Sequence, residues 1–152
     1  MKTILLLSGG GGTEHEISQV SSAYLQKSIT PYFKVLHIEM TKEGKWLLEN
    51  QEEASLRADK KLYTASGASQ TIDYVIPCIH GTPGETGDIQ SYLEIIGLPY
   101  FGCKAEACTL TFNKVSTKLW LSAANISNTP FVFLIDLDQS HKAFDVFVQW
   151  KN

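Results

Sequence analysis

The sequence contains almost no arginine, since Arg57 is the only one among 13 basic residues. The planar guanidinium forks that usually clamp phosphates and carboxylates are therefore nearly missing. The formal net charge of -3 provides no basic field, so we expect neither nucleic acid nor an anionic lipid surface as a partner. A reaction that needs several arginine side chains therefore lacks most of them in this sequence.

Paired cysteines and long apolar runs are missing too. Cys78, Cys103 and Cys108 form no CxxC pattern, so we expect reduced thiols rather than disulfides or a zinc site. The apolar run at residues 4–7 is too short for a signal sequence, and no run approaches the length of a membrane span. We therefore expect a soluble cytoplasmic protein with no membrane partner.

The first part of the chain alternates strand and helix patterns, and its 152 residues suit about one domain. Residues 2–8 form a short apolar run that ends in glycines, as a buried strand does. Residues 17–29 repeat apolar side chains at helical spacing, and residues 33–40 alternate like a strand. Residues 41–68 are polar, and we expect a loosely structured excursion there, with one short strand at residues 46–48 on the sheet edge.

The second part continues the alternation. A strand is expected at residues 72–79, a helix with Ile89, Leu93 and Ile96 on one face, a short strand at residues 98–102, and one or two helices within residues 105–124. These elements predict an α/β fold, a mostly parallel open sheet with helices on both faces.

The last residues of the chain are expected to form two strands, at residues 131–137 and 144–150. The second of these runs almost to the final residue with no closing helix after it. Because exposed strand edges need cover, we expect that the chain stops short of a complete fold.

Two glycine-rich loops, at residues 9–12 and 80–87, each follow an apolar strand. In an open α/β sheet ligands bind at the carboxyl ends of the strands, so we expect both loops to converge at one edge. The first loop is no dinucleotide fingerprint, because Glu14 and His15 occupy the positions where that spacing requires glycine, and no Walker A lysine follows. Glu14 either stabilises the first helical turn or binds a cation, and His80 either contacts a ligand or is satisfied inside a tight connection.

Three ordered blocks of the sequence match one family. The first pairs Gly9 and Gly10 with the run Glu-His-Glu-Ile-Ser at residues 14–18, and it resembles the N-terminal signature of D-alanine:D-alanine ligases. The second, residues 80–102, is similar in order and spacing to that family's HG..GE.G..Q...LE..G.PY.G pattern. The third resembles the M-D-K stretch that opens the family's ATP-grasp portion, and it consists of Phe112-Asn113-Lys114 with Thr117-Lys118. Asn113 replaces the usual aspartate.

This resemblance implies a Rossmann-like pre-ATP-grasp domain at residues 1–103, on the substrate side, and the beginning of an incomplete ATP-grasp region at residues 104–152. The implied reaction joins two D-alanines into the dipeptide of peptidoglycan precursors. ATP makes an acyl phosphate that the second amine attacks, and Mg²⁺ neutralises the transferred phosphate. ATP and Mg²⁺ are therefore the cofactors expected of the complete enzyme.

The resemblance also implies roles for single residues. Glu14 corresponds to the catalytic-site acid that holds the ammonium group of the first D-alanine, by a charge-assisted hydrogen bond. His80 lies beside the same substrate, and Ser18 and the amide of Gly81 are expected to complete the substrate pocket. Lys114 matches a lysine that contacts ATP phosphates, although an ordinary solvated helix lysine is the alternative. No residue is assigned to a metal.

Most of the family's ATP-grasp fold has no counterpart in this sequence. Residues 145–148 look like the strand that leads to an ATP-binding lysine in the family, but residues 149–152 do not match. We therefore expect the N-terminal part of a ligase, inactive as an isolated chain, that forms a homodimer through its N-terminal domain. Two alternatives remain: a non-catalytic dimerising remnant of the ligase fold, and a nucleotide-binding module suggested only by the glycine run.

Overall fold

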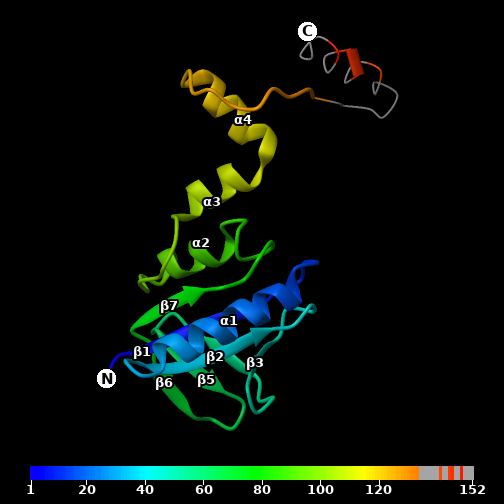
Figure 1. Cartoon of the computed structure of the whole chain (residues 1–152). Helices are drawn as coiled ribbons and strands as arrows, with labels where there is room; N and C mark the ends of the chain where they lie inside the picture. The colour runs from blue at the N-terminus through cyan, green and yellow to red at the C-terminus, as the bar shows by residue number, and fades with distance from the viewer. Residues whose placement is uncertain (134–140, 142–143, 146–147, 149–152) are drawn as a thin grey trace. The chain divides into compact units, whose positions relative to one another are not determined.

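The computed structural model divides the chain into two compact units, Met1–Phe112 and Asn113–Asn152 (Figure 1). It describes residues 1–133, 141, 144–145 and 148. The units divide after the helix that ends at Phe112, whereas the functional boundary expected from the sequence lies at residue 103; that boundary stays a prediction. Within the described residues, no helix is both long and apolar enough to span a bilayer.

The main sheet of the first unit is built around strand β1 (Thr3–Gly9), in which every residue is buried. It pairs in parallel with β2 (Lys34–Met40) on one side and with β7 (Tyr74–Pro77) on the other. The short strand β3 (Trp46–Leu48) adds to β2 in the antiparallel direction, which gives the order β3-β2-β1-β7. The mostly parallel sheet is therefore confirmed. Of the strand expected at residues 98–102, the structure shows one parallel bridge, from Tyr100 to Val75.

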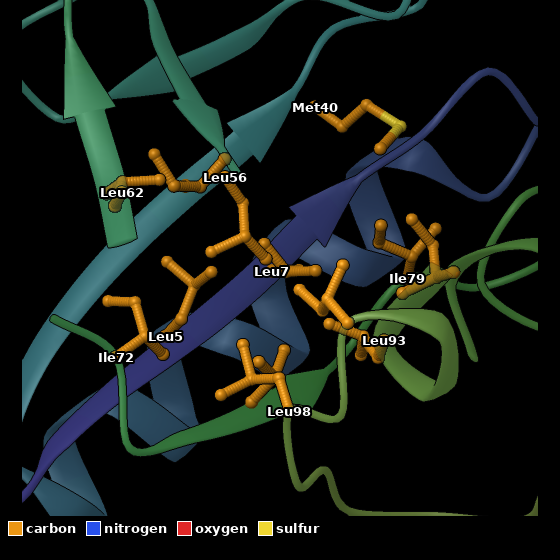
Figure 2. Packing of buried hydrophobic residues seen from close by; sticks show 13 residues of the cluster. Leu5, Leu7, Met40, Leu56, Leu62, Ile72, Ile79, Leu93 and Leu98 are labelled. Atoms are coloured by element: carbon orange, nitrogen blue, oxygen red, sulfur yellow. The ribbon is translucent and has the colours of Figure 1, made fainter. Parts of the chain in front are cut away.

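Helices cover both faces of this sheet. Helix α1 (His15–Ile29) packs against β1 and β2. On the opposite face, Leu5 and Leu7 of β1 pack with Leu93 of helix α2 (Asp88–Ile95), as Figure 2 shows. Successive side chains of a strand point to opposite faces of the sheet. The uninterrupted apolar run of β1 therefore packs against α1 on one face and against the layer that contains α2 on the other.

The polar stretch after β3 is more ordered than expected. It forms an antiparallel three-stranded sheet from β4 (Ala54–Leu56), β5 (Lys61–Thr64) and β6 (Ser69–Thr71). Leu56 and Leu62 are buried in the core, over the same face of β1 as α2 (Figure 2). The prediction of a loosely structured excursion is therefore wrong. Strands of three or four residues with at most one buried leucine each show too little periodicity to be recognised from sequence.

Two further helices follow, α3 (Ala105–Phe112) and α4 (Lys114–Ala123). Residues 131–133 are described and are not in a strand, and the rest of the strand predicted at 131–137 lies outside the described residues. Of the strand predicted at 144–150, the described residues Phe144, Asp145 and Val148 are helical, so the prediction is wrong at these positions. Its other residues lie outside the described part.

Helix α2 offers a direct test of the core. Leu93 has no exposed surface, whereas Ile95, two positions later, is 82% exposed. We expect Leu93→Ala to lower the free energy of unfolding by about 2–5 kcal/mol, because it removes buried contacts and leaves a cavity. The matched change Ile95→Ala should stay within about 0.5 kcal/mol of the parent chain. Urea unfolding followed by circular dichroism measures both, and equal losses would contradict this packing.

Candidate functional site

The two glycine-rich loops meet at the carboxyl ends of β1 and β7. A β-carbon placed on Gly10 would lie 2.7 Å from Ile79 Cγ2 and 3.0 Å from the carbonyl oxygen of Thr82. One placed on Gly12 would lie 3.8 Å from the carbonyl oxygen of His80. The loops therefore touch along their backbones, which confirms that they converge at one sheet edge. Gly10 also has a φ of +101°, a conformation that side chains disfavour.

Ser18 fastens this arrangement from α1. Its side chain is completely buried, and its hydroxyl oxygen accepts a hydrogen bond from the Gly9 amide at 2.8 Å. The same hydroxyl donates to the Cys78 carbonyl oxygen at 2.6 Å. The hydroxyl thus joins the ends of β1 and β7, and its bonding capacity is engaged within the chain. Burial also raises the pKa of the Cys78 thiol, so this thiol stays protonated at neutral pH.

Glu14 lies where the two loops meet. It is exposed, immediately precedes α1, and makes no side-chain capping hydrogen bond to that helix. Its Oε2 atom is 3.7 Å from the position that a β-carbon on Gly81 would occupy. The structure therefore brings together Glu14 from the first loop and Gly81 from the second, although the two residues are far apart in the sequence.

His80 stands between α1 and its own loop. Its Nε2 atom is 3.4 Å from Ser21 Oγ, and its Nδ1 atom is 3.8 Å from Glu85 Oε1. The side chain is 37% exposed. It lines a pocket of about 430 Å³ together with the apolar side chains of Leu25, Ile76 and Phe101. The imidazole is thus accessible and held by neighbours on two elements.

Three polar residues beside His80 were given no role from the sequence. Ser21 and Glu85 contact the imidazole, and Gln90 donates from Nε2 to the Gly84 carbonyl oxygen at 2.6 Å. Gln90 is 5% exposed, so this buried hydrogen bond connects helix α2 to the backbone of the second loop. Glu85 and Gln90 both belong to the HG..GE.G..Q pattern, which could have indicated them.

Comparison with known proteins identifies the family. Residues 3–103 match the family model described as D-ala D-ala ligase N-terminus. The chain belongs to this family. Among similar proteins is the D-alanine--D-alanine ligase of Aliivibrio fischeri, which is 47% identical over 99% of this chain and 47% of its own length. The chain therefore spans about half the length of the curated relatives it matches.

Solved structures agree with the family and with the fold. The D-alanine-D-alanine ligase from Aeromonas hydrophila has a TM-score of 0.82 and 50% identity, covering 88% of this chain and 50% of that one. The D-alanyl-alanine synthetase A from Vibrio cholerae has a TM-score of 0.87 and 48% identity, covering 98% of this chain and 46% of that one. The α/β architecture described above is thus that of this ligase family.

Lys114 begins helix α4 of the second unit. Asn113 caps this helix: its side chain accepts a hydrogen bond from the Ser116 amide at 3.1 Å. Asparagine and aspartate are about equally good N-caps, so asparagine in place of the aspartate expected from the resemblance keeps the start of the helix. Among the described residues, no group of three or more His, Cys, Asp or Glu side chains is placed to hold a metal ion.

Proposed function

We propose that this chain is the N-terminal, substrate-side part of a D-alanine:D-alanine ligase, and that it binds the first D-alanine between its glycine loops. The observation that carries the proposal is the approach of the Glu14 carboxylate to the backbone of Gly81, beside an accessible His80. The relatives that match most of this chain bear the name of that enzyme. The proposed setting is the cytoplasm, where the dipeptide would serve peptidoglycan synthesis.

The residues of the site suit an amino-acid zwitterion. The Glu14 carboxylate would accept a charge-assisted hydrogen bond from the ammonium group, which is stronger than a bond between neutral groups. His80 would orient the same ligand, and the Gly81 amide would complete its polar contacts. Ser18 would act on the ligand through the loops that it holds together rather than by direct contact, because its hydroxyl is buried and engaged.

Titration of the chain with D-alanine and L-alanine tests this function. We expect D-alanine to shift the backbone amide signals of Gly10, Gly81 and the residues next to Glu14, because these lie at the meeting point of the loops. L-alanine, of the same size and charge, should shift them less at equal concentration. If neither amino acid shifts these signals, the non-catalytic remnant becomes the better description.

The complete reaction is proposed for the whole ligase and not for this chain by itself. In the whole enzyme ATP would be the energy source, Mg²⁺ the metal, and Lys114 a phosphate contact. Electrostatic stabilisation of the transition state is usually the largest catalytic effect, and the described residues hold no metal-ligating cluster. We therefore expect the isolated chain to release no phosphate from ATP when D-alanine is added. A coupled phosphate assay beside a full-length relative measures this, and a matching rate would contradict the expectation.

A homodimer is the proposed assembly. Helix α1 exposes Ile17, Val20 and Tyr24 at 58%, 71% and 74%, and their spacing places them on one face. An exposed apolar helix face is typical of an interface, and two copies related by a two-fold axis can cover it mutually.

The surface of α1 makes this assembly testable. We expect light scattering at micromolar concentration to give the mass of two chains, and Val20→Asp to reduce it to one, because a charge would be buried at the interface. The control Ile95→Asp changes a similarly exposed apolar residue on α2 and should leave the mass unchanged. A wild-type chain that is monomeric at this concentration would contradict the proposal.

A further inference from the structure

The side chain of His15 is held between two oxygen atoms. It is 9% exposed, its Nδ1 atom lies 2.8 Å from the Gly10 carbonyl oxygen, and its Nε2 atom lies 3.2 Å from Glu39 Oε1. A carbonyl oxygen and an ionised carboxylate can only accept hydrogen bonds. Both ring nitrogens must therefore carry a hydrogen to satisfy these two contacts. A ring with hydrogens on both nitrogens is an imidazolium cation.

Neither neutral form of the ring fits this position as well. A hydrogen on Nδ1 alone would satisfy Gly10 but would leave the lone pair of Nε2 facing the Glu39 carboxylate. A hydrogen on Nε2 alone would leave Nδ1 facing the Gly10 carbonyl at 2.8 Å. Because the ring is nearly excluded from water, the facing lone pairs cannot be separated by solvent there.

The carboxylate beside the ring comes from the neighbouring strand. Glu39 of β2 is the acidic side chain that contacts His15 directly. In the turn after β2, the pKa of Glu43 is lowered, first by hydrogen bonds from the Thr41 side chain and its own backbone and further by attraction to Lys42 and His15.

The ring also determines the shape of the first loop. The Gly10 amide donates to the Met40 carbonyl oxygen at 2.8 Å, and the Gly10 carbonyl oxygen faces His15 Nδ1. The neighbouring Gly9 amide donates to Ser18. Both backbone polar groups of Gly10 therefore have a partner within the chain. Glu14 follows soon after in the sequence, separated from the glycines of this loop only by Thr13.

We propose that His15, as an imidazolium paired with Glu39, is the positioning residue of the first glycine loop and thereby of the Glu14 carboxylate. Its effect on D-alanine rests on the proposed function, whereas its charge state and its effect on the loop do not. The residue acts through Gly10 and makes no contact with the ligand in this proposal.

The charge state is measured by nitrogen-15 NMR of the imidazole ring in the intact chain. We expect both His15 nitrogens to show the signals of N–H groups at neutral pH. A parent ring that carries one hydrogen at neutral pH would overturn the proposal.

The effect on the loop is measured by hydrogen exchange of the Gly10 amide. His15→Leu supplies no donor, and we expect Gly10 to exchange about tenfold faster or more, as for the loss of a hydrogen bond from a charged donor. His15→Arg supplies two donors at every accessible pH and should restore most of the protection. The Val75 amide, which donates to the Pro99 carbonyl oxygen, reports on the sheet and should be unchanged in both variants. Equal exchange of Gly10 in the parent and in His15→Leu would overturn the proposal, as would failure of His15→Arg to restore it.

If the parent chain binds no D-alanine, the proposed function fails, but the ring spectrum and the exchange of Gly10 still decide the role of His15.

Discussion

Replacing Glu14 with glutamine is expected to weaken D-alanine binding about tenfold or more, while the chain remains folded. The change keeps the shape of the side chain but removes its charge, so the hydrogen bond to the ligand's ammonium group is no longer charge-assisted. Little stability should be lost, because Glu14 is exposed and makes no capping bond to α1. Isothermal titration measures the affinity, and circular dichroism verifies the fold.

Glu16 provides the matched control for this experiment. It lies in the first turn of the same helix, is exposed, and carries the same charge. Glu14→Gln and Glu16→Gln each remove one negative charge near the N-terminus of the same helix, so their general electrostatic effects should be alike. Glu16→Gln should nevertheless bind D-alanine almost as the parent chain does, because Glu16 is not a proposed ligand contact. If both variants lose affinity equally, a diffuse electrostatic effect explains the loss and Glu14 is no ligand contact.

Replacing Gly9 with alanine is expected to destabilise the chain by about 2–5 kcal/mol, the sum of a left-handed backbone penalty and overpacking. The φ of Gly9 is +83°, and a β-carbon there would lie 2.2 Å from the Met40 carbonyl oxygen and 3.0 Å from His15 Cε1. Backbone atoms of β2 would have to move, which would also disturb the bond from the Gly9 amide to Ser18. Denaturant unfolding measures the change.

Gly11, in the same loop, distinguishes this effect from a general need for glycine. A β-carbon on Gly11 would lie 3.5 Å from the Lys42 carbonyl oxygen, which is an ordinary contact, and its φ is not positive. We expect Gly11→Ala to cost less than about 1 kcal/mol, because the added methyl group requires no movement. A Gly11→Ala variant as unstable as Gly9→Ala would show that the loop is differently arranged.

The candidate site could be located from the sequence because its signals are local. The apolar run of β1 ends directly in glycines, and the apolar strand before His80 ends in the same way. Parallel strands bring such ends to one edge of the sheet, which is why Glu14 could be associated with the second loop before any contact was known. The ligase-like blocks are the basis for proposing D-alanine as the ligand, which local patterns do not contain.

The sequence by itself determined the strands of the main sheet, the helices α1 and α2, the two loops and the family. The strands, helices and loops each depend on a periodicity or a motif within about 20 neighbouring residues, and the family depends on three such motifs in order. All of them can therefore be recognised without knowing the fold. The sheet formed by β4, β5 and β6 was missed because its strands are short and are stabilised by packing on the main core.

Only the tertiary structure decided how the site is held. Ser18 reaches Cys78, which lies 60 positions further along the chain, and His15 reaches Glu39, which lies 24 positions further along. A serine and a histidine in a helix are equally compatible with solvent, ligand or backbone contacts until the neighbouring strands are in place. Their roles follow from which donors and acceptors burial leaves facing each other, and that depends on the packing of elements distant in the sequence.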